Sequence, residues 1–436
     1  MSDVVILGAG MSGLAAAIAS GGEVYEAAAR PGGLCATYYL VPGENRRRGD
    51  AHDRAYRFEI GGGHWIWGCE GLVERFVSSL VTLKSYARRA GVYIAPGGTR
   101  APFPLQHHLG ALGKQVAARA LAEIVERAAR PGSGETMRAC LEGHFGPTLL
   151  EVFFASFQSR YTAGLWEEIA PEDAGKAPLN LRQVIGGALG VAPVCGYNAT
   201  FQYPEQGLGA LAEAMARRCQ VKFRQPVVAI DAAAHRLRCA GGSSRRYQVM
   251  LSTLPLRRTV ELAGVRVAAP PDPYVSVLVL NLGGSRGRNC PREHWMYVAD
   301  SRSGFHRVGF YSNVDRDFLP RARRRSPRAV SLYVEKAYRG GCKPSPRQLA
   351  ASAAAVVEEL RAWGWLDTVE VMDPTWIEVA YTWRAPGSCW PEQAMAALAR
   401  QGIYSLGRYG RWATGLLEQG LAQALAAGFQ SGASLA

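Results

Sequence analysis

The chain has 436 residues, of which 48% are hydrophobic and 20% charged, and it carries a formal net charge of +14. This length predicts two or three domains with cores of their own, and no apolar run is long enough to span a bilayer. The nine cysteines are dispersed without a Cys-x-x-Cys pair, so no zinc motif is readable and a reducing compartment is favoured. Since the N-terminus has no signal-peptide pattern, we expect a cytoplasmic protein without a transmembrane segment.

The positive charge comes almost entirely from arginine, because only six of the 50 basic residues are lysine. A basic chain can bind nucleic acid or another polyanion. However, the arginine runs at residues 46–48 and 323–325 lack the interleaved aromatic residues of a single-strand-binding surface. We therefore interpret these runs as solvated loops, with a polyanion site as the alternative, and expect no nucleic acid partner.

The first predicted elements are a buried strand at residues 4–7 and a helix at residues 14–18, separated by Gly8-Ala9-Gly10-Met11-Ser12-Gly13. Such glycines permit a tight turn, close approach of a diphosphate and packing of the helix on the strand. A second strand at residues 23–26 ends on Glu26, which can accept ribose hydroxyls. Glu26 follows Gly8 by 18 residues, slightly fewer than the roughly 20 usual for this fingerprint. The pattern indicates a dinucleotide site with a shortened crossover, and a structural turn is the alternative.

The middle of the chain changes from helical to strand-like patterns. Apolar spacing predicts helices at residues 114–130, 135–145 and 148–158, which together suggest an inserted helical domain. Alternating or β-branched runs then predict the strands of a mostly antiparallel sheet, at residues 274–282, 307–312 and 330–335. Residues 348–363 return to a helical pattern.

The glycine segment, Glu26, Arg30 and Gly32-Gly33 resemble the FAD-dependent superfamily that includes amine oxidases, protoporphyrinogen oxidase and UDP-galactopyranose mutase. Residues 58–64, 252–255 and 406–410 resemble further segments of that superfamily. The resemblance implies an α/β fold with a Rossmann-like FAD-binding domain of the glutathione-reductase type, an inserted helical domain and a mostly antiparallel β-sheet substrate domain. We expect these three domains at residues 1–85 with 204–262 and 390–436, at residues 105–203, and at residues 86–104 with 263–389.

By the same resemblance, sixteen positions are expected to contact FAD. They are Gly8, Gly10, Ser12, Gly13, Glu26, Arg30, Gly32, Gly33, Gly62, Gly63, His64, Val228, Thr253, Gly407, Arg408 and Leu416.

Several segments resemble UDP-galactopyranose mutases in particular, namely residues 101–108, 196–209, 295–313 and 407–412. The implied catalytic residues are His64, Arg307 and Arg408, with the two arginines holding a diphosphate. The implied substrate-binding residues are Phe103, Gln106, Trp166, Lys176, Asn198, Tyr297, Arg307 and Arg384. Structural alternatives stay open: core packing for Phe103 and Trp166, a solvated charge for Lys176, an ion pair within the sheet for Arg307, and a structural role for His64.

The chain also departs from the mutase pattern. Thr414 and Glu418 stand where that family has a phosphate-binding tyrosine and asparagine, and residues 383–386 replace its Tyr-Pro-Thr-Pro segment. A carboxylate at Glu418 would repel a diphosphate if it faced the substrate, and Arg384 is a candidate for compensating.

The resemblance implies a mutase reaction, in which reduced FAD attacks the anomeric carbon of a nucleotide sugar through N5 and the sugar ring opens and recloses without net redox change. It also implies a nucleotide-sugar or other anionic small-molecule substrate and an external reductant such as NAD(P)H. The alternatives are an FAD-dependent oxidase or desaturase of the amine oxidase type, and a noncatalytic protein that binds flavin or a polyanion.

Overall fold

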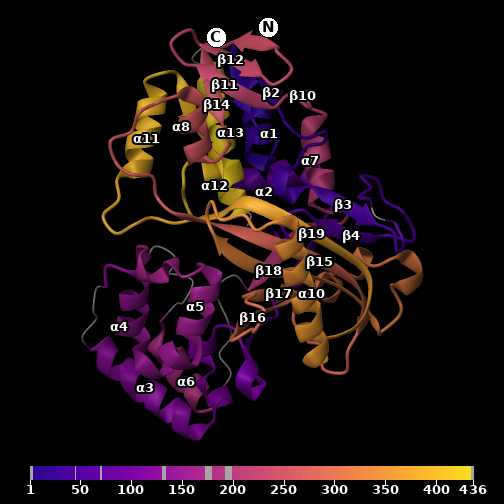
Figure 1. Cartoon of the computed structure of the whole chain (residues 1–436), viewed down its shortest axis with the longest axis vertical. Coiled ribbons are helices and arrows are strands. Elements are labelled where there is room, and N and C mark those ends of the chain that lie inside the picture. Colours follow the sequence, from indigo (N-terminus) through magenta and orange to yellow (C-terminus); the bar gives the residue numbers. More distant parts are fainter. Residues whose placement is uncertain are drawn as a thin grey trace.

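The computed structural model describes residues 3–44, 46–68, 71–129, 134–171, 179–191 and 199–433. The fold is mixed α/β. A parallel sheet with its helices lies at the top of Figure 1, a large twisted sheet crosses the middle, and a group of helices lies at the lower left. Within the described residues, no helix combines the length and hydropathy needed to cross a membrane.

The parallel sheet is assembled from three distant parts of the chain. Its strand order is β10-β2-β1-β14-β20 and every neighbouring pair is parallel. The strands are β1 (Val4–Leu7), β2 (Glu23–Tyr25), β10 (Gln220–Lys222), β14 (Val249–Ser252) and β20 (Ile403–Ser405).

Helices cover both faces of this sheet, which explains why β1 is apolar at every position. Val4 and Ile6 belong to the same core cluster as α1, α7 and α13, whereas Val5 and Leu7 belong to the cluster of α8 and α11. The helices are α1 (Met11–Ser20), α7 (Leu208–Ala216), α8 (Leu256–Ala263), α11 (Trp390–Ala399) and α13 (Leu417–Ala433).

The large sheet has seven strands in the order β19-β15-β18-β17-β16-β7-β8, and only β16 and β7 pair in parallel. On β15, Leu280 and Leu282 share a core cluster with α10 (Pro346–Ala362), while Val277 and Val279 line a cavity on the opposite face. The strands are β7 (Ala90–Ile94), β8 (Thr99–Pro102), β15 (Tyr274–Arg286), β16 (Trp295–Ala299), β17 (Arg307–Gly309), β18 (Ala329–Arg339) and β19 (Leu366–Thr382).

The strand predicted at residues 307–312 is shorter than expected. It ends at Gly309, and the short helix α9 (Tyr311–Val314) follows. The Phe310 N–H donates to the carbonyl of His294, and the chain then turns into α9, after which the Asp315 N–H donates to the carbonyl of Tyr311. Val308, Phe310 and Tyr311 are all buried across the end of the strand and the start of the helix, so the apolar composition does not mark the turn.

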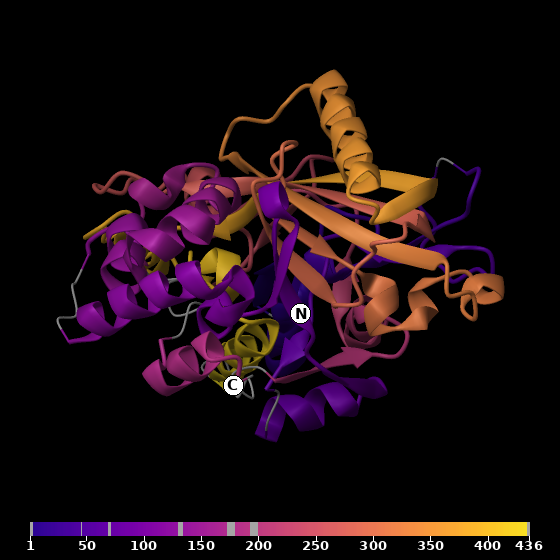
Figure 2. The same cartoon turned by 90° about the horizontal axis from the view of Figure 1, so that it is seen from below.

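The helical region contains α3 (Lys114–Ala128), α4 (Met137–Leu149), α5 (Ala155–Tyr161) and α6 (Leu181–Ala188), with a π-helical turn at Leu150–Phe154 between α4 and α5. Its core is formed by the apolar stripes of α3 and α4, including Ile124 and Phe145. Seen from below, this region lies to one side of the large sheet (Figure 2).

Shorter elements complete the fold. They are the ribbon β3 (Thr37–Leu40) and β4 (Tyr56–Glu59), the three-stranded sheet of β5 (Ile66–Trp67), β6 (Leu83–Ala87) and β9 (Thr200–Pro204), the three-stranded sheet of β11 (Val227–Asp231), β12 (Arg236–Cys239) and β13 (Ser244–Arg246), and the helices α2 (Gly71–Ser78) and α12 (Gly407–Gly410).

We predict that Gly13→Ala destabilises the fold, because a Cβ at Gly13 would lie 1.9 Å from the carbonyl oxygen of Gly8 and force α1 away from β1. The expected loss is about 1–3 kcal/mol, as for other overpacked sites. Urea unfolding of the protein freed of small molecules measures it. Gly10→Ala is the matched control, since a Cβ there would meet nothing within 4 Å. Equal unfolding midpoints for the two variants would contradict the packing argument.

Candidate functional site

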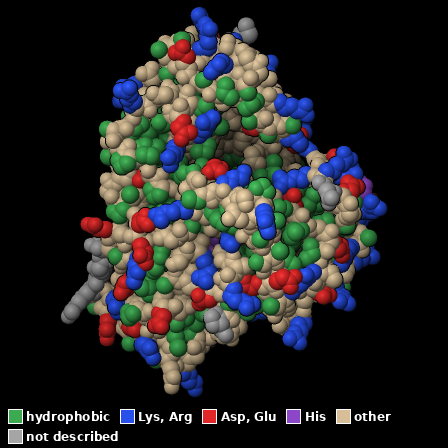
Figure 3. Space-filling model, in the orientation of Figure 1, with side chains coloured by type: hydrophobic (Ala, Val, Ile, Leu, Met, Phe, Trp, Pro, Cys, Tyr) green, Lys and Arg blue, Asp and Glu red, His purple; other side chains and the backbone are tan. Residues whose placement is uncertain are grey.

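A cavity of about 1260 Å³, here called the main cavity, lies between the parallel sheet, the large sheet and the helical region. Its lining includes Gly8 and Thr253 just beyond the carboxyl ends of β1 and β14, where ligands of open α/β sheets usually bind. The face of the molecule seen in Figure 3 has a deep hollow in its upper half, with Lys and Arg side chains around it.

One end of the main cavity has groups that could hold a dinucleotide. Gly10 precedes α1 without any side-chain cap, so the first backbone N–H groups of this helix are available to an anion. The Glu26 carboxylate accepts hydrogen bonds from the N–H groups of Ala9 and Ala28, both at 2.7 Å, which fixes it beside the cradle. A carboxylate held in this way can still accept ribose hydroxyls through its other lone pairs.

The C-terminal part of the chain closes over this cradle. Gly407 has φ +70°, and a Cβ on it would lie 2.7 Å from the Ser12 hydroxyl. On α13, a Cβ at Gly420 would lie 3.1 Å from the same hydroxyl. These two glycines therefore allow segments about 400 residues apart in sequence to meet at the start of α1.

Most of the positions expected to contact the cofactor line the main cavity. They are Gly8, Gly10, Ser12, Glu26, Gly32, Gly33, Gly63, His64, Thr253, Gly407, Arg408 and Leu416.

The other four positions lie elsewhere. Gly13 packs against Gly8, and Gly62 lies behind the lining, where a Cβ would come within 3.1 Å of Glu335. Arg30 pairs with Glu213 at 2.6 Å and lines a second cavity. Val228 is 42% exposed on β11, outside the lining.

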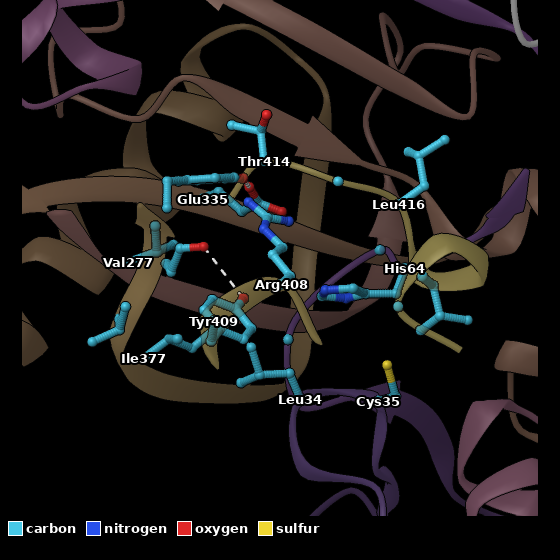
Figure 4. A pocket seen from close by; sticks show the side chains of 18 of the residues that line it. Leu34, Cys35, His64, Val277, Glu335, Ile377, Arg408, Tyr409, Thr414 and Leu416 are labelled. Carbon is cyan, nitrogen blue, oxygen red and sulfur yellow. Dashed lines mark hydrogen bonds between the residues drawn. The ribbon is translucent and has the colours of Figure 1, made fainter. Parts of the chain in front are cut away.

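His64 faces the cavity beside Arg408 (Figure 4). Burial lowers the pKa of His64 to about 4; Glu335 opposes this shift, and the charges of Arg408 and Arg307 reinforce it. The imidazole is therefore neutral at physiological pH and can exchange hydrogen bonds without adding charge. The Arg408 guanidinium lies 5.4 Å from the ring centre of Tyr381 and 5.5 Å from that of Tyr409.

Arg307 forms a buried ion pair at the cavity wall. Arg307 and Glu335 are directly opposite each other on the antiparallel strands β17 and β18, and Arg307 Nη2 donates to Glu335 Oε1. Tyr381 donates to Glu335 Oε2 at 3.1 Å, and His306 Nε2 lies 3.5 Å from that oxygen. Arg307 thus both faces the cavity and forms the ion pair within the sheet that was the structural alternative for it.

The Glu335 carboxylate is ionised despite being only 2% exposed. Burial alone would raise its pKa, but the charge of Arg307 and the neighbouring His306 outweigh burial and lower the pKa to about 2. Burial likewise lowers the pKa of His306, although Glu335 opposes the shift. The charges on this wall are therefore Arg307 and Glu335, which largely offset each other, and Arg408 nearby.

Three of the expected substrate-binding residues come together in the main cavity. Phe103 and Tyr297 have ring centres 4.7 Å apart, and Gln106 is buried close by in the same lining. Arg88, which sequence reasoning did not single out, lies 5.7 Å from the ring centre of Phe103. This group combines flat faces with hydrogen-bonding groups, which suits a base or another planar ligand.

Arg307 is a fourth expected substrate-binding residue in this lining, whereas Trp166 and Arg384 are not part of it. Trp166 is 3% exposed in the core of the helical region, with Arg138 5.5 Å from its ring centre. Arg384 pairs with Glu392 at 2.5 Å. Lys176 and Asn198 lie outside the described residues.

The two departures from the mutase pattern have different positions. Thr414 lines the main cavity, close to Arg408 in Figure 4. Glu418 is buried outside the lining, where its carboxylate accepts a 3.3 Å hydrogen bond from the N–H of Trp67. Burial raises the pKa of Glu418, which weakens any repulsion of a bound anion.

Sequence reasoning missed the aromatic wall and the counter-ion of Arg307. The wall is formed by residues after α4, namely Phe153, Phe154, Phe157 and Tyr161. Their helical spacing predicts burial but does not separate core from cavity. The sequence offered one signal for Glu335, namely that an acidic residue ends the apolar strand predicted at residues 330–335.

Comparisons with known proteins agree with this architecture. A family model described as flavin containing amine oxidoreductase matches residues 11–264. A reduced UDP-galactopyranose mutase superposes with a TM-score of 0.84 at 22% identity, covering 100% of this chain and 94% of that one. A protein assigned as a protoporphyrinogen oxidase from an Exiguobacterium species gives 0.69 at 15%, with 99% and 98% covered, and a putrescine oxidase variant gives 0.58 at 14%, with 99% of each covered. No curated protein sequence matches the chain.

We predict that Glu335→Gln lowers the free energy of unfolding by about 3–5 kcal/mol at neutral pH, because it leaves Arg307 buried without its counter-charge. Urea unfolding monitored by tryptophan fluorescence measures the loss. Glu378→Gln is the matched control, since Glu378 also lines the cavity but is exposed. Equal stability of the two variants would show that the pair does not support the fold.

The ion pair of Arg307 and Glu335 also makes the stability of the fold depend on pH in the acidic range. Because folding lowers the pKa of Glu335 from 4.5 to about 2, its stabilising contribution is complete above pH 4.5 and disappears as the pH falls toward 2. We therefore expect the stability difference between wild type and Glu335→Gln to shrink across that window. Urea unfolding at several acidic pH values tests this, and a difference independent of pH would contradict it.

Proposed function

The chain belongs to the flavin-containing amine oxidoreductase family, and from this premise we propose that it is an FAD-dependent enzyme of the UDP-galactopyranose mutase kind, which interconverts the ring forms of a nucleotide sugar. The supporting observation is that Phe103, Gln106 and Tyr297 converge on the same cavity as the dinucleotide cradle and Arg408. The likeness to the mutase fold extends over the whole chain.

The residues present fit a flavin dinucleotide. The uncapped start of α1 can hold the diphosphate, and the open space beside Gly10 lets the backbone approach it. Glu26 can receive the ribose hydroxyls, and His64 and Gly63 lie farther along the same cavity. A dinucleotide-binding domain of the glutathione-reductase type is part of this proposal.

When bound in its reduced form, the flavin supplies an electron-rich nitrogen nucleophile, so that the reaction needs no net redox change. The chain's own contribution is to position the substrate and to balance its charge. Arg408 and Arg307 would hold the departing diphosphate. On Arg307, Nη2 is occupied by Glu335, but Nε has no hydrogen-bond partner among the described residues, so the N–H groups other than those of Nη2 would serve.

The aromatic pair would bind the base. Phe103 and Tyr297 offer a face for stacking, and Gln106 can both donate and accept hydrogen bonds. Neutral His64 would hold a hydrogen bond near the reacting ring without opposing the arginines. In the same proposal an external donor such as NAD(P)H reduces the flavin, and the enzyme acts in the cytoplasm without a nucleic acid partner.

One observation favours a second candidate, a flavin-dependent oxidase or desaturase. Glu335 offsets the charge of Arg307, and the Phe153, Phe154 and Phe157 side chains make the neighbouring wall apolar. Such a wall suits a less anionic substrate than a nucleotide sugar. The flavin would then be the acceptor in a net oxidation.

We predict that the dithionite-reduced protein interconverts UDP-galactofuranose and UDP-galactopyranose, whereas the oxidised protein does not. Chromatography of the sugar nucleotides measures conversion, and heat extraction of the yellow protein identifies FAD. Conversion by the oxidised enzyme would contradict the mechanism. Peroxide production from an amine or a polycyclic substrate, without any conversion, would support the second candidate instead.

We also predict that Phe103→Ala and Tyr297→Ala each weaken UDP binding about tenfold, because an aromatic stack on a base contributes about 1–3 kcal/mol. Titration of the flavin fluorescence with UDP gives the dissociation constant. Tyr404→Ala is the matched control, since Tyr404 is exposed on β20 outside the main cavity. Unchanged UDP affinity in both cavity variants would show that the base does not bind between Phe103 and Tyr297.

A further inference from the structure

A second cavity, of about 920 Å³, adjoins the main cavity, and Gly33 lines both. The second cavity lies among the β3–β4 ribbon, the loop between these strands, the start of α7 and residues 317–324. Five arginines line it: Arg30, Arg47, Arg48, Arg57 and Arg324. Both arginine runs of the sequence thus contribute to one cavity, although they lie about 270 residues apart.

Four of these arginines have carboxylate partners on or near the surface. The pairs are Arg30 with Glu213 at 2.6 Å, Arg47 with Asp373 at 2.6 Å, Arg48 with Glu44 at 2.9 Å and Arg324 with Asp317 at 2.8 Å. Partly exposed pairs of this kind contribute little to stability. Their guanidinium groups can therefore turn toward an incoming anion at small cost.

Arg57 differs from the other four because it is only 5% exposed. Its Nη1 donates a 3.0 Å hydrogen bond to the carbonyl of Glu205, but Nε and Nη2 have no hydrogen-bond partner among the described residues. Its Cζ lies 4.3 Å from the ring centre of Phe318. This cation–π contact covers one face of the guanidinium and provides no acceptor for the in-plane N–H groups of Nε and Nη2.

No carboxylate neutralises Arg57 at contact distance in the described part of the chain. The nearest candidate along its own strand, Glu59, directs its oxygens to the hydroxyls of Thr37 and Tyr203 and to the N–H of Leu208. Burial raises the pKa of Glu59 to about 7 although the charge of Arg57 opposes the shift, so Glu59 supplies only part of a counter-charge. Burying a charge without a partner costs several kcal/mol. Such an arrangement is expected where a ligand supplies the missing charge.

We propose that the second cavity binds a small phosphate-bearing anion, held by Arg57 at its base and by Arg48 and Arg324 at its rim. The planar guanidinium fork matches the oxygens of a phosphate. Asp53, Glu205, Glu213 and Asp317 also line the cavity, so its small net positive charge suits a small anion better than a long polyanion such as nucleic acid. The site is separate from the cradle and does not depend on the substrate of the main cavity.

Isothermal titration calorimetry of the flavin-loaded protein tests this proposal, with inorganic phosphate, pyrophosphate and AMP as separate probes at constant ionic strength. We expect saturable binding of at least one probe. Arg57→Met should weaken that binding by about tenfold or more, the effect of losing a charge-assisted hydrogen bond. Comparison of the three probes distinguishes free phosphate from a phosphate ester.

Arg48 and Arg324 lie on the accessible rim, so the variants Arg48→Met and Arg324→Met keep the test decisive if Arg57→Met does not fold. Each of the two should weaken binding severalfold. Arg328→Met is the matched control, since Arg328 is exposed and lines neither cavity. The proposal is overturned if no probe binds, if the cavity variants bind like wild type, or if Arg88→Met in the main cavity abolishes binding instead. Tighter binding of a short oligonucleotide than of every probe would also overturn it.

Discussion

The ion pair between Arg307 and Glu335 determines the chemistry of the main cavity. It joins two strands of the large sheet directly opposite each other and places one positive and one negative group on the same wall. Because the two charges largely offset each other, the positive charge of the lining near this pair comes from Arg408, and Arg88, Arg257 and Arg258 add charge elsewhere in the lining. The pair also brings His306 and Tyr381 into one network, so a change at any of these residues alters the electrostatics of the cavity wall.

The cofactor end of the cavity depends instead on backbone shape. Three positions require glycine because the backbone there approaches another residue closely. Gly8 approaches Thr253, Gly13 approaches Gly8, and Gly407 approaches Ser12. The parallel sheet places these segments at one edge, and the helix start then faces the cavity without a capping side chain. The two ends of the cavity therefore rest on different physics, the glycine-rich end on missing side chains and the opposite end on aromatic faces and balanced charges.

Local sequence patterns were sufficient to predict the glycine-rich turn, because the strand at residues 4–7 and the helix after it follow from apolar spacing and glycine positions. The distant segments at residues 58–64, 252–255 and 406–410 resemble the flavoprotein superfamily, and all three contribute residues to the main cavity. By contrast, Glu335 opposes Arg307 only because two strands pair across 28 residues, and strand register is not readable from either run alone. Trp166 and Val228 show the same limit: position in a motif does not reveal which face of an element meets the cavity. The convergence of the two arginine runs likewise required the fold.

The contact of α13 and α12 with the start of α1 has a consequence for biosynthesis. Gly407 and Gly420 reach Ser12 only after more than 400 residues have been translated, which takes tens of seconds at ordinary ribosome speeds. During that interval β14 lacks its outer neighbour β20, and the start of α1 lacks its contacts with α12 and α13. The surroundings of the glycine-rich turn are thus completed only when nearly the whole chain has been synthesised.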